Sequence, residues 1–468
     1  MEPDQYARIP LGVGALSLLD TDLCKLTMQA AVLEYFPNVP VAYELTNRTP
    51  AKKFSRAAFR WLEEEIDHLD ALTLDEDELV FLREACPFLK PAYLGFLRTL
   101  RLNPKEHVFL DFDPNDGAES SEELGSLRLV VKGPWAQAIS YEVPLLVLVC
   151  EAYFRFMDTD WTHEGQEEKA FRKGMTLLEA GCNFAEYGAR RRRDCLTQVL
   201  VLRGLVRAKE RGYELGLSGS FSGTSNVRLA KKFGLKPMGT VGHEWFMGVA
   251  AVVDDYRTST ALALRYWLDC FGEGIWKVVP TDTFGTPAFL ESFAQPMETT
   301  SRSSPRRDGL SPARVESPRL APRSDSFAEA FGGVRQDSGD PEIFIGLMRD
   351  FYDKVGISGD KTLVFSDSLN DDLCIKLKEM SEAAGFKSAF GIGTFFTNDF
   401  TACITGKKST PLNVVIKLAS AAGRPAVKIT DAAGKNAGDI ATIQRVKREL
   451  GYKETEWEGD DESRRWGE

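Results

Sequence analysis

His243 is the residue of this chain whose type and position most suggest catalysis. It is one of only four histidines in 468 residues, and it follows a short predicted strand within the run GTVGHEW, residues 239–245. A neutral imidazole at the end of a strand can attack a phosphoryl group or move a proton near pH 7. His68 lies on a charged predicted helical face, and His107 and His163 lie in polar, loop-like surroundings. The alternative for His243 is a packed or surface histidine without a chemical role.

Seven polar loops share one topological place, because each directly follows a predicted strand. A β/α barrel brings such loops together at the carboxyl ends of its strands, where barrel enzymes carry out their chemistry. Any one loop alone would be explained by ordinary turn residues. The loops are rich in glycine, hydroxyl and acidic side chains, and they are residues 186–191, 218–226, 239–245, 281–286, 335–341, 366–370 and 391–394.

The chemistry of these loops indicates phosphate. Gly391 and Gly393 leave backbone N–H groups uncovered, so an anion can approach them closely. Asp337, Asp340 and Asp367 offer hard carboxylate oxygens, which suit ribose hydroxyls or a magnesium ion. The alternative for the acidic loops is capping of the helices that follow them.

Arginines accompany the same loops. Arg190, Arg191 and Arg335 carry a planar, positively charged fork that matches carboxylates and phosphates. The alternative for residues 190–193 is a solvated basic face or a nuclear-import patch. Together the loops predict a phosphate-rich substrate accompanied by magnesium.

From about residue 164 onward, amphipathic helical segments alternate with short apolar strands. Helices are predicted at residues 164–180 and 192–211 and within 245–271. Strands are predicted at residues 182–186, 214–217, 237–241, 276–280, 333–335, 362–365 and 387–390. Repeated β–α units of this kind form a parallel sheet. The sequence therefore predicts an α/β protein, with an irregular β/α barrel and an additional α+β domain.

The two ends of the chain have a looser pattern. A helix after Ser55 and strands at residues 41–45 and 127–131 precede the barrel. The apolar runs 412–418 and 426–429 predict a hairpin after it. We expect an N-terminal α+β domain (1–160), the barrel (161–400) and a C-terminal segment that completes the first domain (401–468).

Residues 296–328 interrupt the barrel. Ser, Pro and Arg dominate this segment, and scarcely any apolar residue anchors it, which predicts a disordered insertion. Its Ser-Pro steps begin at Ser304, Ser311 and Ser317. They are either phosphorylation sites or parts of a tolerated spacer.

Composition excludes several classes of function. The net charge of −11 and the pI near 5.2 argue against general binding to nucleic acid or to an anionic membrane. Eight cysteines without C-x-x-C spacing indicate reduced, intracellular thiols. The first ten residues lack a signal-peptide pattern, and the longest apolar run, 143–149, is too short to span a bilayer. We expect a cytoplasmic location, with the nucleus as a second compartment, and no nucleic-acid or membrane partner.

The strand-end motifs are long enough to compare with known families. They include SLLDTDL (17–23), EYGARRRR (186–193), GTSN (223–226), GTVGHEWFMG (239–248), TDTFGT (281–286), VRQDSGDP (334–341), FSDSLN (365–370), GIGTFFTND (391–399) and NVVIKL (413–418). Together they resemble the nicotinate phosphoribosyltransferases of the fungal type. The resemblance implies an irregular barrel of the type II phosphoribosyltransferase kind and a homodimer with shared active sites. It also implies ATP-coupled synthesis of nicotinate mononucleotide from nicotinate and 5-phosphoribosyl 1-pyrophosphate, in NAD salvage.

The resemblance assigns roles to the candidate residues. His243 would be phosphorylated transiently by ATP, Asp282 would orient its imidazole, and Asp337 would complete the catalytic set. Magnesium and ATP are the implied cofactors, without assigned metal ligands. The implied phosphate-binding residues are Ser366, Asp367, Gly391, Gly393, Thr394 and Arg48.

Substrate choice is predicted at the ring pocket. Tyr187 would stack on the pyridine ring, with Arg190 and Arg335 nearby. Nicotinamide-using relatives have an aspartate where this chain has Ser225, and a hydroxyl can donate to the carboxylate of nicotinate that an aspartate would repel.

Three positions depart from the family pattern, and one of them is Gly242, which stands where alanine is common. Cys24 stands where a tyrosine usually crosses the dimer interface to close the second face of the ring. Phe395 replaces an asparagine of the phosphate loop. Cys24 therefore affects the expected ring binding, and Phe395 affects the expected geometry of the phosphate loop.

Two other functions stay open from the sequence. A quinolinate- or nicotinamide-type phosphoribosyltransferase would not require ATP, so nicotinate-stimulated ATP hydrolysis separates it from the expected enzyme. A catalytically weak relative would bind nucleotides as a sensor or scaffold. Binding of phosphoribosyl pyrophosphate without product formation would indicate that second function.

Overall fold

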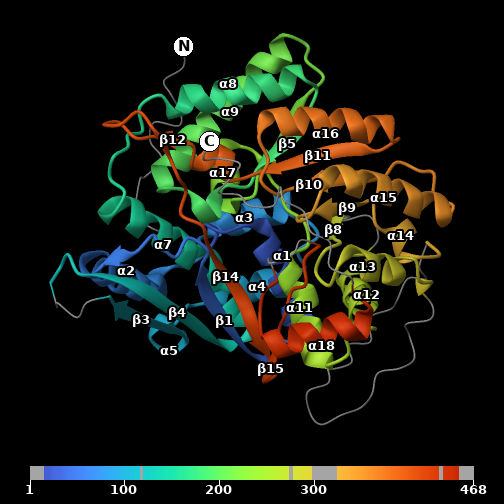
Figure 1. Ribbon diagram of the computed structural model, residues 1–468, viewed down its shortest axis with the longest axis horizontal. Coiled ribbons are helices and arrows are strands. Elements are labelled where there is room, and N and C mark those ends of the chain that lie inside the picture. Colours follow the sequence, from blue (N-terminus) through green and yellow to red (C-terminus); the bar gives the residue numbers. More distant parts are fainter. Residues whose placement is uncertain (1–14, 116–119, 273–277, 298–323, 432–435, 453–468) are drawn as a thin grey trace.

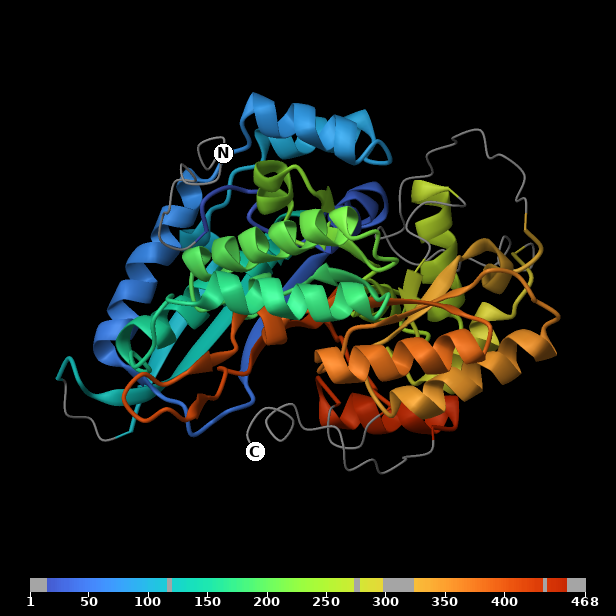
Figure 2. The same cartoon turned by 90° about the horizontal axis from the view of Figure 1, so that it is seen from above.

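Two large sheets organise the protein. The computed structural model describes residues 15–115, 120–272, 278–297, 324–431 and 436–452. One sheet is antiparallel and belongs mainly to the N-terminal part, and the other is the parallel sheet of the barrel (Figure 1). A view from above shows the N-terminal helices and sheet on one side and the C-terminal β–α units on the other (Figure 2).

The antiparallel sheet joins the beginning and the end of the chain. Its order is β15-β14-β1-β4-β2, and β3 also pairs with β4. The strands are β1 (Pro40–Asn47), β2 (Phe54–Ser55), β3 (Val108–Pro114), β4 (Leu124–Pro134), β14 (Val414–Ala421) and β15 (Arg424–Pro425). The strands predicted at 41–45 and 127–131 are confirmed as parts of β1 and β4.

The hairpin predicted near the C-terminus is wrong in its second strand. Only β15 pairs back onto β14, and Pro425, its last residue, has no N–H for the ladder. Residues 426–431 instead return to the barrel, where the Ile429 N–H donates to the Thr283 carbonyl at 2.7 Å. A short antiparallel pair, β12 (Phe400–Thr401) and β13 (Lys408–Ser409), precedes this segment.

The helices of the N-terminal part include several that pack against the antiparallel sheet. They are α1 (Leu23–Tyr35), α2 (Arg56–Asp67), α3 (Glu76–Ala85), α4 (Pro91–Thr99), α5 (Pro104–His107), α6 (Trp135–Ala138), α7 (Glu142–Phe156) and the short 3-10 helices η1 (His68–Ala71) and η2 (Ile139–Tyr141). In the described ranges, one helical stretch, Trp135–Phe156, is long and apolar enough to cross a membrane, and 89% of its most apolar part is buried inside the protein. Such burial is typical of a core helix. His107, predicted in a polar loop, is buried in α5 beside the Tyr141 hydroxyl.

The parallel sheet forms the predicted irregular barrel. Its order is β7-β6-β5-β11-β10-β9-β8. The strands are β5 (Asn183–Glu186), β6 (Ser220–Thr224), β7 (Lys236–Pro237), β8 (Val278–Pro280), β9 (Gly333–Gln336), β10 (Thr362–Phe365) and β11 (Lys387–Ile392). Between β7 and β8 the described residues form no strand ladder, but the Val241 N–H donates to the Val278 carbonyl at 3.3 Å. The sheet is therefore a curled half-barrel with an irregular closure.

Helices alternate with the barrel strands as predicted. They are α8 (Gln166–Glu179), η3 (Ala189–Arg191), α9 (Cys195–Glu214), α10 (Val227–Phe233), α11 (His243–Val253), α12 (Ser259–Phe271), α13 (Thr286–Phe293), α14 (Phe327–Ala330), α15 (Pro341–Lys354), α16 (Asp371–Ala383), α17 (Thr394–Thr397) and α18 (Ile440–Leu450). The helical pattern predicted within 245–271 is two helices, because α11 ends at Asp254 with a positive φ of 55°.

The strand predicted at residues 214–217 is wrong. Those residues are the end of α9 and the turn after it, and the true strand is β6. Its sequence, SFSGT, contains a single large apolar side chain, Phe221. A strand with one large apolar residue does not show the apolar run by which strands are predicted from sequence.

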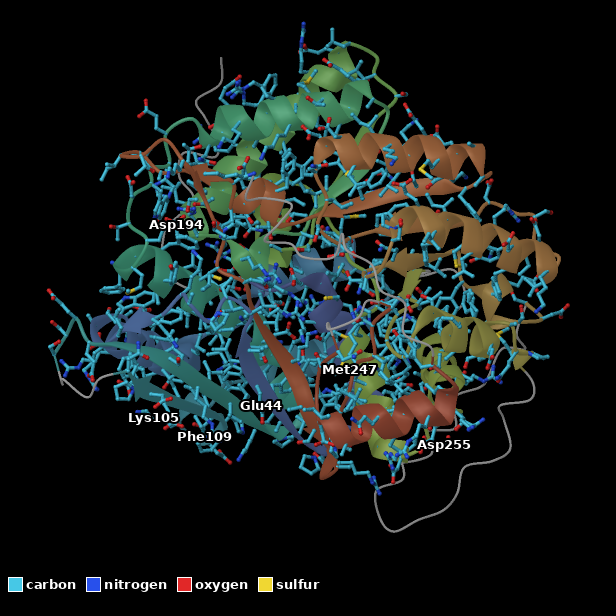
Figure 3. The ribbon with its side chains drawn as sticks, viewed as in Figure 1. Glu44, Lys105, Phe109, Asp194, Met247 and Asp255 are labelled. Atoms are coloured by element: carbon cyan, nitrogen blue, oxygen red, sulfur yellow. The ribbon has the colours of Figure 1, made fainter. Side chains whose placement is uncertain are left out.

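The two parts of the protein share one core. The rings of Trp135 and Trp245 lie 6.2 Å apart, and those of Trp245 and Trp267 lie 6.1 Å apart. Gly248 permits this packing, since a Cβ there would lie 2.0 Å from the Trp135 ring. Met247, on the same helix, lies near the centre of the molecule (Figure 3). This core fixes α11, and hence its first residue, between the sheet and the barrel.

The predicted insertion is described only at its ends. Pro296 forms a bridge with Ser326, and α14 begins at Phe327. These ends are regularly hydrogen-bonded, so the disorder predicted across 296–328 is wrong at its boundaries. Residues 298–323, which contain the Ser-Pro steps, lie outside the described residues.

Candidate active site

His243 is the first residue of α11 and follows the helix cap Gly242. It lies at a loop-to-helix junction, because the preceding strand already ends at Pro237. Its Nε2 lies 2.9 Å from Asp337 Oδ2, and its Nδ1 lies 3.0 Å from the Thr283 hydroxyl oxygen. The two partners come from the loops after β9 and β8. They orient the imidazole from both sides.

A lysine that the sequence analysis did not identify completes this cluster. Lys428 Nζ lies 3.1 Å from His243 Nε2 and 2.9 Å from Asp282 Oδ2. Asp282, predicted to orient the imidazole, lies 3.5 Å from His243 Nε2, whereas Asp337 lies at 2.9 Å. The nearer carboxylate is therefore Asp337, because Asp282 is directed towards Lys428 and the Ser338 hydroxyl. The only signal in the sequence was a lone lysine in the apolar run AVKI.

Burial and charge set the protonation of this cluster. Burial and the positive charge of Lys428 lower the pKa of His243 from 6.5 to about 4. Burial opposes ionisation of Asp337, but Arg335, the His243 hydrogen bond and Lys428 hold its pKa well below the ordinary range. Burial also opposes ionisation of Asp282, but Lys428, His243 and the Ser338 hydrogen bond together lower its pKa. At neutral pH the imidazole is uncharged, which is the form that can act as a nucleophile.

The same residues have the composition of a candidate metal site. His243, Asp282 and Asp337 offer ligand atoms that all lie within 4.8 Å of one another. However, Lys428 Nζ is 2.9–3.8 Å from all three residues, so a cation already neutralises them. An ammonium group at this distance would repel a magnesium ion held by the trio. Asp340, also predicted as a magnesium or ribose ligand, caps α15.

Tyr187 and Arg335 define a second group at the strand ends. A Cβ on Gly391 would lie 2.7 Å from Cδ2 of the Tyr187 ring, so glycine leaves room for this ring. Gly391 lies within β11 and not in the loop predicted for it. Arg335 Nη1 donates to the Thr240 hydroxyl, and Arg335 Nη2 lies 3.9 Å from Asp337. Arg335 also lies close enough to Tyr187 for its charge to oppose the rise that burial causes in the tyrosine pKa, so it connects the tyrosine region to the His243 cluster.

Ser225 belongs to a third group, centred on Asp22. The Ser225 hydroxyl donates to Asp22 Oδ1 at 2.7 Å, and Arg190 Nε donates to Asp22 Oδ2 at 2.6 Å. Arg190 also pairs with Glu142 at 2.7 Å. The hydroxyl that was expected to donate to nicotinate is thus engaged with Asp22, a residue that the sequence analysis did not single out.

Cys24 lies beside this group, in the first turn of α1. Its Sγ is 3.6 Å from Nη2 of Arg190 in the same chain. Burial raises the pKa of the Cys24 thiol to about 11, so it stays protonated at neutral pH. It is a half-buried neutral group beside the arginine.

A buried network ties α1 to α7 and α11. Lys25 pairs with Glu142 and Glu244. Glu244 also accepts hydrogen bonds from the Tyr43 hydroxyl at 2.5 Å and from Trp135 Nε1 at 3.0 Å. Glu142 also pairs with Arg190, which in turn binds Asp22. The network therefore holds the Asp22 group in place.

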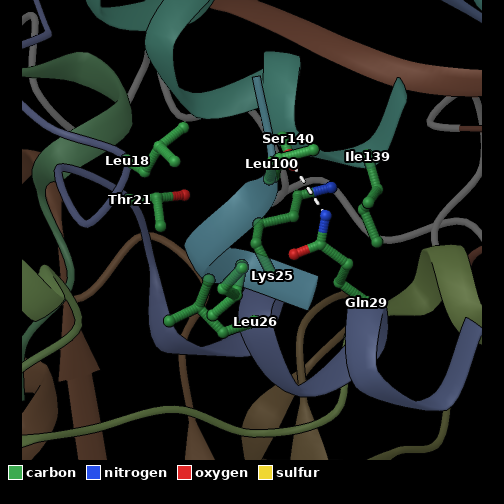
Figure 4. Close-up of a pocket in the computed structure, with 9 residues that line it drawn as sticks. Leu18, Thr21, Lys25, Leu26, Gln29, Leu100, Ile139 and Ser140 are labelled. Carbon is green, nitrogen blue, oxygen red and sulfur yellow. Dashed lines mark hydrogen bonds between the residues drawn. The ribbon is translucent and has the colours of Figure 1, made fainter. Parts of the chain in front are cut away.

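A small cavity lies next to Lys25 (Figure 4). Leu18, Leu26 and Ile139 contribute apolar walls, and the Gln29 amide donates to the Ser140 hydroxyl at 2.8 Å. None of the predicted site residues lines this cavity. It is separate from the His243 cluster.

The predicted phosphate-binding residues lie at the ends of β10 and β11. Ser366 Oγ donates to Asp337 Oδ1 at 2.6 Å, which places it at the His243 cluster. Asp367 accepts from the Ser368 hydroxyl at 3.0 Å. Gly393 and Thr394 lie at the start of α17.

Phe395 packs against the outer helix α8. The ammonium of Lys173 lies 3.6 Å from the centroid of the Phe395 ring and 2.6 Å from Asp399 Oδ2. The phenylalanine is only 8% exposed. Its substitution for the usual asparagine therefore changes the packing behind the loop.

Arg48 follows β1, and its N–H donates to the Asn413 carbonyl at 2.8 Å. Burial, followed by the positive charges of Lys428 and Arg48, lowers the pKa of Lys417 to about 7. Asp337 and Asp282 act on Lys417 in the opposite direction. We call Arg48, Lys417 and Lys428 the cationic cluster.

Comparisons with known proteins identify the family. Residues 19–150 match the nicotinate phosphoribosyltransferase (NAPRTase) N-terminal domain, and residues 182–454 match the nicotinate phosphoribosyltransferase (NAPRTase) family. The chain is 41% identical over 437 residues to a Schizosaccharomyces pombe protein named as a probable nicotinate phosphoribosyltransferase, covering 93% of this chain and 97% of that protein. It is 39% identical to the nicotinate phosphoribosyltransferase of Saccharomyces cerevisiae, covering 96% and 98%.

Solved structures agree with these sequence matches. The Saccharomyces cerevisiae crystal structure superposes with a TM-score of 0.84 at 38% identity, covering 94% of this chain and 99% of that one. The structure from Porphyromonas gingivalis gives a TM-score of 0.75 at 29% identity, covering 93% and 100%. The chain is therefore an enzyme that belongs to the nicotinate phosphoribosyltransferase family.

Proposed function

We propose that this enzyme joins nicotinate to 5-phosphoribosyl 1-pyrophosphate, giving nicotinate mononucleotide and diphosphate for NAD salvage. In this reaction the pyridine nitrogen bonds to C1 of the ribose while the bond from C1 to the diphosphate breaks. Membership of the family supports the overall reaction. The observation that carries the mechanism is the neutral imidazole of His243, held between Asp337 and Thr283.

ATP coupling would use His243 as the phosphoryl acceptor. Nε2 lies 2.9 Å from the Asp337 carboxylate and 3.1 Å from the Lys428 ammonium. We assign the ring hydrogen to Nε2, because the nearer partner is a carboxylate oxygen, which can only accept it. Nδ1 then carries the lone pair, next to the Thr283 hydroxyl. Nδ1 would attack the γ-phosphorus of ATP while the bond to the departing ADP breaks. Asp337 would stabilise the positive charge that the ring acquires.

The phosphoribosyl pyrophosphate would lie against the cationic cluster. C1 of the ribose becomes positively charged as the diphosphate leaves, and cations stabilise the leaving group. Lys428 supplies positive charge next to Asp337, and Lys417, with its pKa lowered to about 7, adds charge when it is protonated. Ser366, Gly393 and Thr394 offer polar groups at the ends of β10 and β11.

Magnesium fits this site only together with the substrate. Lys428 argues against a resident ion on the histidine trio, but Asp337 is 28% exposed and offers a hard oxygen ligand. We propose that Asp337 contributes to holding a magnesium ion that arrives with the diphosphate. Such an ion would supply positive charge for the leaving group.

Nicotinate would lie between Tyr187 and the Asp22 group. Tyr187 offers an aromatic face, and Arg335 and Arg190 offer positive charge for the carboxylate. Since Ser225 donates to Asp22, we propose that it favours nicotinate by holding that aspartate in place. A homodimer would place a partner subunit at the second face of the ring, but Cys24 in place of the usual tyrosine leaves that face without an aromatic contact.

The test measures nicotinate mononucleotide formed from nicotinate and phosphoribosyl pyrophosphate, with and without ATP, for the wild type and His243→Ala. ATP labelled at the γ-phosphate shows whether the protein acquires an acid-labile phosphoryl group. We expect ATP stimulation and labelling in the wild type only.

His163→Ala is the matched control. His163 pairs with Asp194 at 2.8 Å, which is a histidine–carboxylate contact outside the His243 cluster. This variant should keep both labelling and ATP stimulation. Retention of ATP-stimulated synthesis by His243→Ala would exclude the phosphohistidine mechanism. Binding of phosphoribosyl pyrophosphate without any product would instead favour a sensor or scaffold.

A further inference from the structure

A chain of buried polar side chains lies next to the proposed pyridine pocket. It runs from the end of β5 to the segment that precedes α1. Each member has an exposed fraction of 0%, and the members are Glu186, Thr224, Gln198, Arg192, Asp20 and Asn226. Because these groups are completely buried, water cannot replace a lost hydrogen-bond partner, and each lost bond costs stability.

Glu186 is the member closest to the pocket. Its Oε1 accepts from the Gly188 N–H, and its Oε2 accepts from the Thr224 hydroxyl at 2.6 Å and from Gln198 Nε2 at 2.9 Å. No lysine or arginine in the described part of the chain forms an ion pair with it. Burial raises the pKa of Glu186, and the three hydrogen bonds oppose that rise. Its carboxylate therefore accepts hydrogen bonds from neutral donors only, among the described residues.

These contacts hold the two walls of the pocket together. Tyr187 lies between Glu186 and Gly188 in sequence, so the bond to the Gly188 N–H fixes the turn that carries the tyrosine. Thr224 precedes Ser225, whose own N–H donates to the Glu186 carbonyl at 2.8 Å. One residue thus connects the end of β5 to the end of β6 through both its backbone and its side chain.

We infer that Glu186 is a positioning residue for the pyridine pocket, and that it sets the spacing between Tyr187 and Ser225. This role rests on the proposed function, which places nicotinate between those residues. Glu186 does not contact the His243 cluster in the described hydrogen bonds. Its loss should therefore affect the use of nicotinate more than the reaction with ATP.

The direction of the hydrogen bonds makes the inference specific. Gln198 donates to Glu186 and accepts at its Oε1 from Arg192 Nη1 at 2.9 Å. Arg192 in turn donates to both oxygens of Asp20, each at 2.9 Å. An amide at position 186 would place an N–H₂ group against either the Gly188 N–H or the Gln198 amide. If Gln198 flipped to accept it, the Gln198 N–H₂ would face Arg192.

Glu186→Gln is therefore the first variant, measured by steady-state kinetics with each substrate varied. An unmet buried donor should raise the KM for nicotinate roughly tenfold. The KM for phosphoribosyl pyrophosphate and the rate of ATP hydrolysis without nicotinate should stay within about twofold, since the His243 cluster is untouched. A weaker perturbation, Thr224→Ala, serves as a second variant if Glu186→Gln does not fold.

The exchange Glu186→Gln with Gln198→Glu supplies the decisive control. It restores a donor facing an acceptor between positions 186 and 198, and it gives Arg192 a carboxylate. Recovery of the nicotinate KM to within about threefold of the wild type would support the inference. An unchanged nicotinate KM in Glu186→Gln would overturn it, as would an equal rise for both substrates that the exchange does not repair. If the wild type makes no nicotinate mononucleotide, both the proposed function and this inference are refuted. If the wild type is active, the variants test this inference alone.

Discussion

Replacing Lys428 by methionine removes the cation that, together with burial, keeps His243 neutral. In the wild type, Lys428 Nζ lies between the imidazole and Asp282. Methionine preserves most of the side-chain volume but not the charge. We expect a loss of stability whose size depends on pH, and an acid limb of the activity profile that moves to higher pH.

The burial of the Lys428–Asp282 ion pair sets the expected loss of stability in Lys428→Met. The side chains of Lys428 and Asp282 are only 7% and 1% exposed. Removing one partner of a buried ion pair costs about 3–5 kcal/mol, because the remaining charge is left without compensation. A domain is stable by roughly 5–15 kcal/mol in total, so the variant should melt measurably earlier.

The sign of the pH dependence follows from His243. Its pKa of about 4 in the folded wild type lies below its ordinary value of 6.5, partly because of Lys428. The contribution of His243 to the free energy of unfolding of the wild type is fully present above pH 6.5, and it is lost as the pH falls towards 4. Without Lys428, two carboxylates remain beside the imidazole and raise its pKa. A protonated His243 would then replace part of the missing charge at acid pH, so the variant loses less stability near pH 5 than near pH 8.

The assay compares the free energy of unfolding of the wild type and Lys428→Met at pH 5 and pH 8, from urea titrations. Lys428→Arg keeps the charge and should stay close to the wild type at both values. The double variant Lys428→Met/Asp282→Asn should recover stability at pH 8. An equal loss at pH 5 and pH 8 would refute the coupling between Lys428 and His243.

Three further substitutions test the nicotinate pocket and the packing behind the phosphate loop. Ser225→Asp should raise the KM for nicotinate at least tenfold, because it places a second carboxylate against Asp22 at the position of a 2.7 Å hydrogen bond; an equal effect on phosphoribosyl pyrophosphate would contradict this. Cys24→Tyr should lower the KM for nicotinate about fivefold if the second ring face is open, since an aromatic contact contributes about 1 kcal/mol; an unchanged KM would show that the stack is not used. Phe395→Asn should change the KM for phosphoribosyl pyrophosphate by less than about twofold while lowering the melting temperature, because the ring packs under Lys173.

The barrel could be predicted because its signal is local and repeated. Alternating apolar strands and amphipathic helices indicated six of the seven parallel strands, and the loops after them converge as expected. The strand predicted at residues 237–241 is wrong in its extent, because it shares only Pro237 with β7. Strand β6 was missed because SFSGT offers one large apolar side chain, Phe221, and its pairing with β5 is a tertiary property. The convergence itself is seen in the contacts of Asp337, which reach His243 after β7 and Ser366 after β10.

Neighbouring charges in the sequence were a poor guide to the environment of each side chain. The run at 190–193 could have been a solvated basic face, yet Arg192 and Arg193 have an exposed fraction of 0%. Arg192 donates to Asp20, whereas Arg193 lies about 4 Å from the ring centroids of Phe154 and Phe400. Adjacent arginines thus enter different buried environments, because a turn points successive side chains in different directions.

The protonation of His243 depends on a residue that no local pattern connects to it. Its neighbour in sequence, Glu244, pairs with Lys25 and leaves the imidazole without a local counter-charge. Lys428, which lies 185 residues away in sequence, helps to lower the pKa of the histidine while neutralising Asp282. A histidine beside two carboxylates alone would gain a proton more readily. Burial and the lysine together reverse that tendency, so the C-terminal return to the barrel contributes to making His243 suitable as a neutral nucleophile.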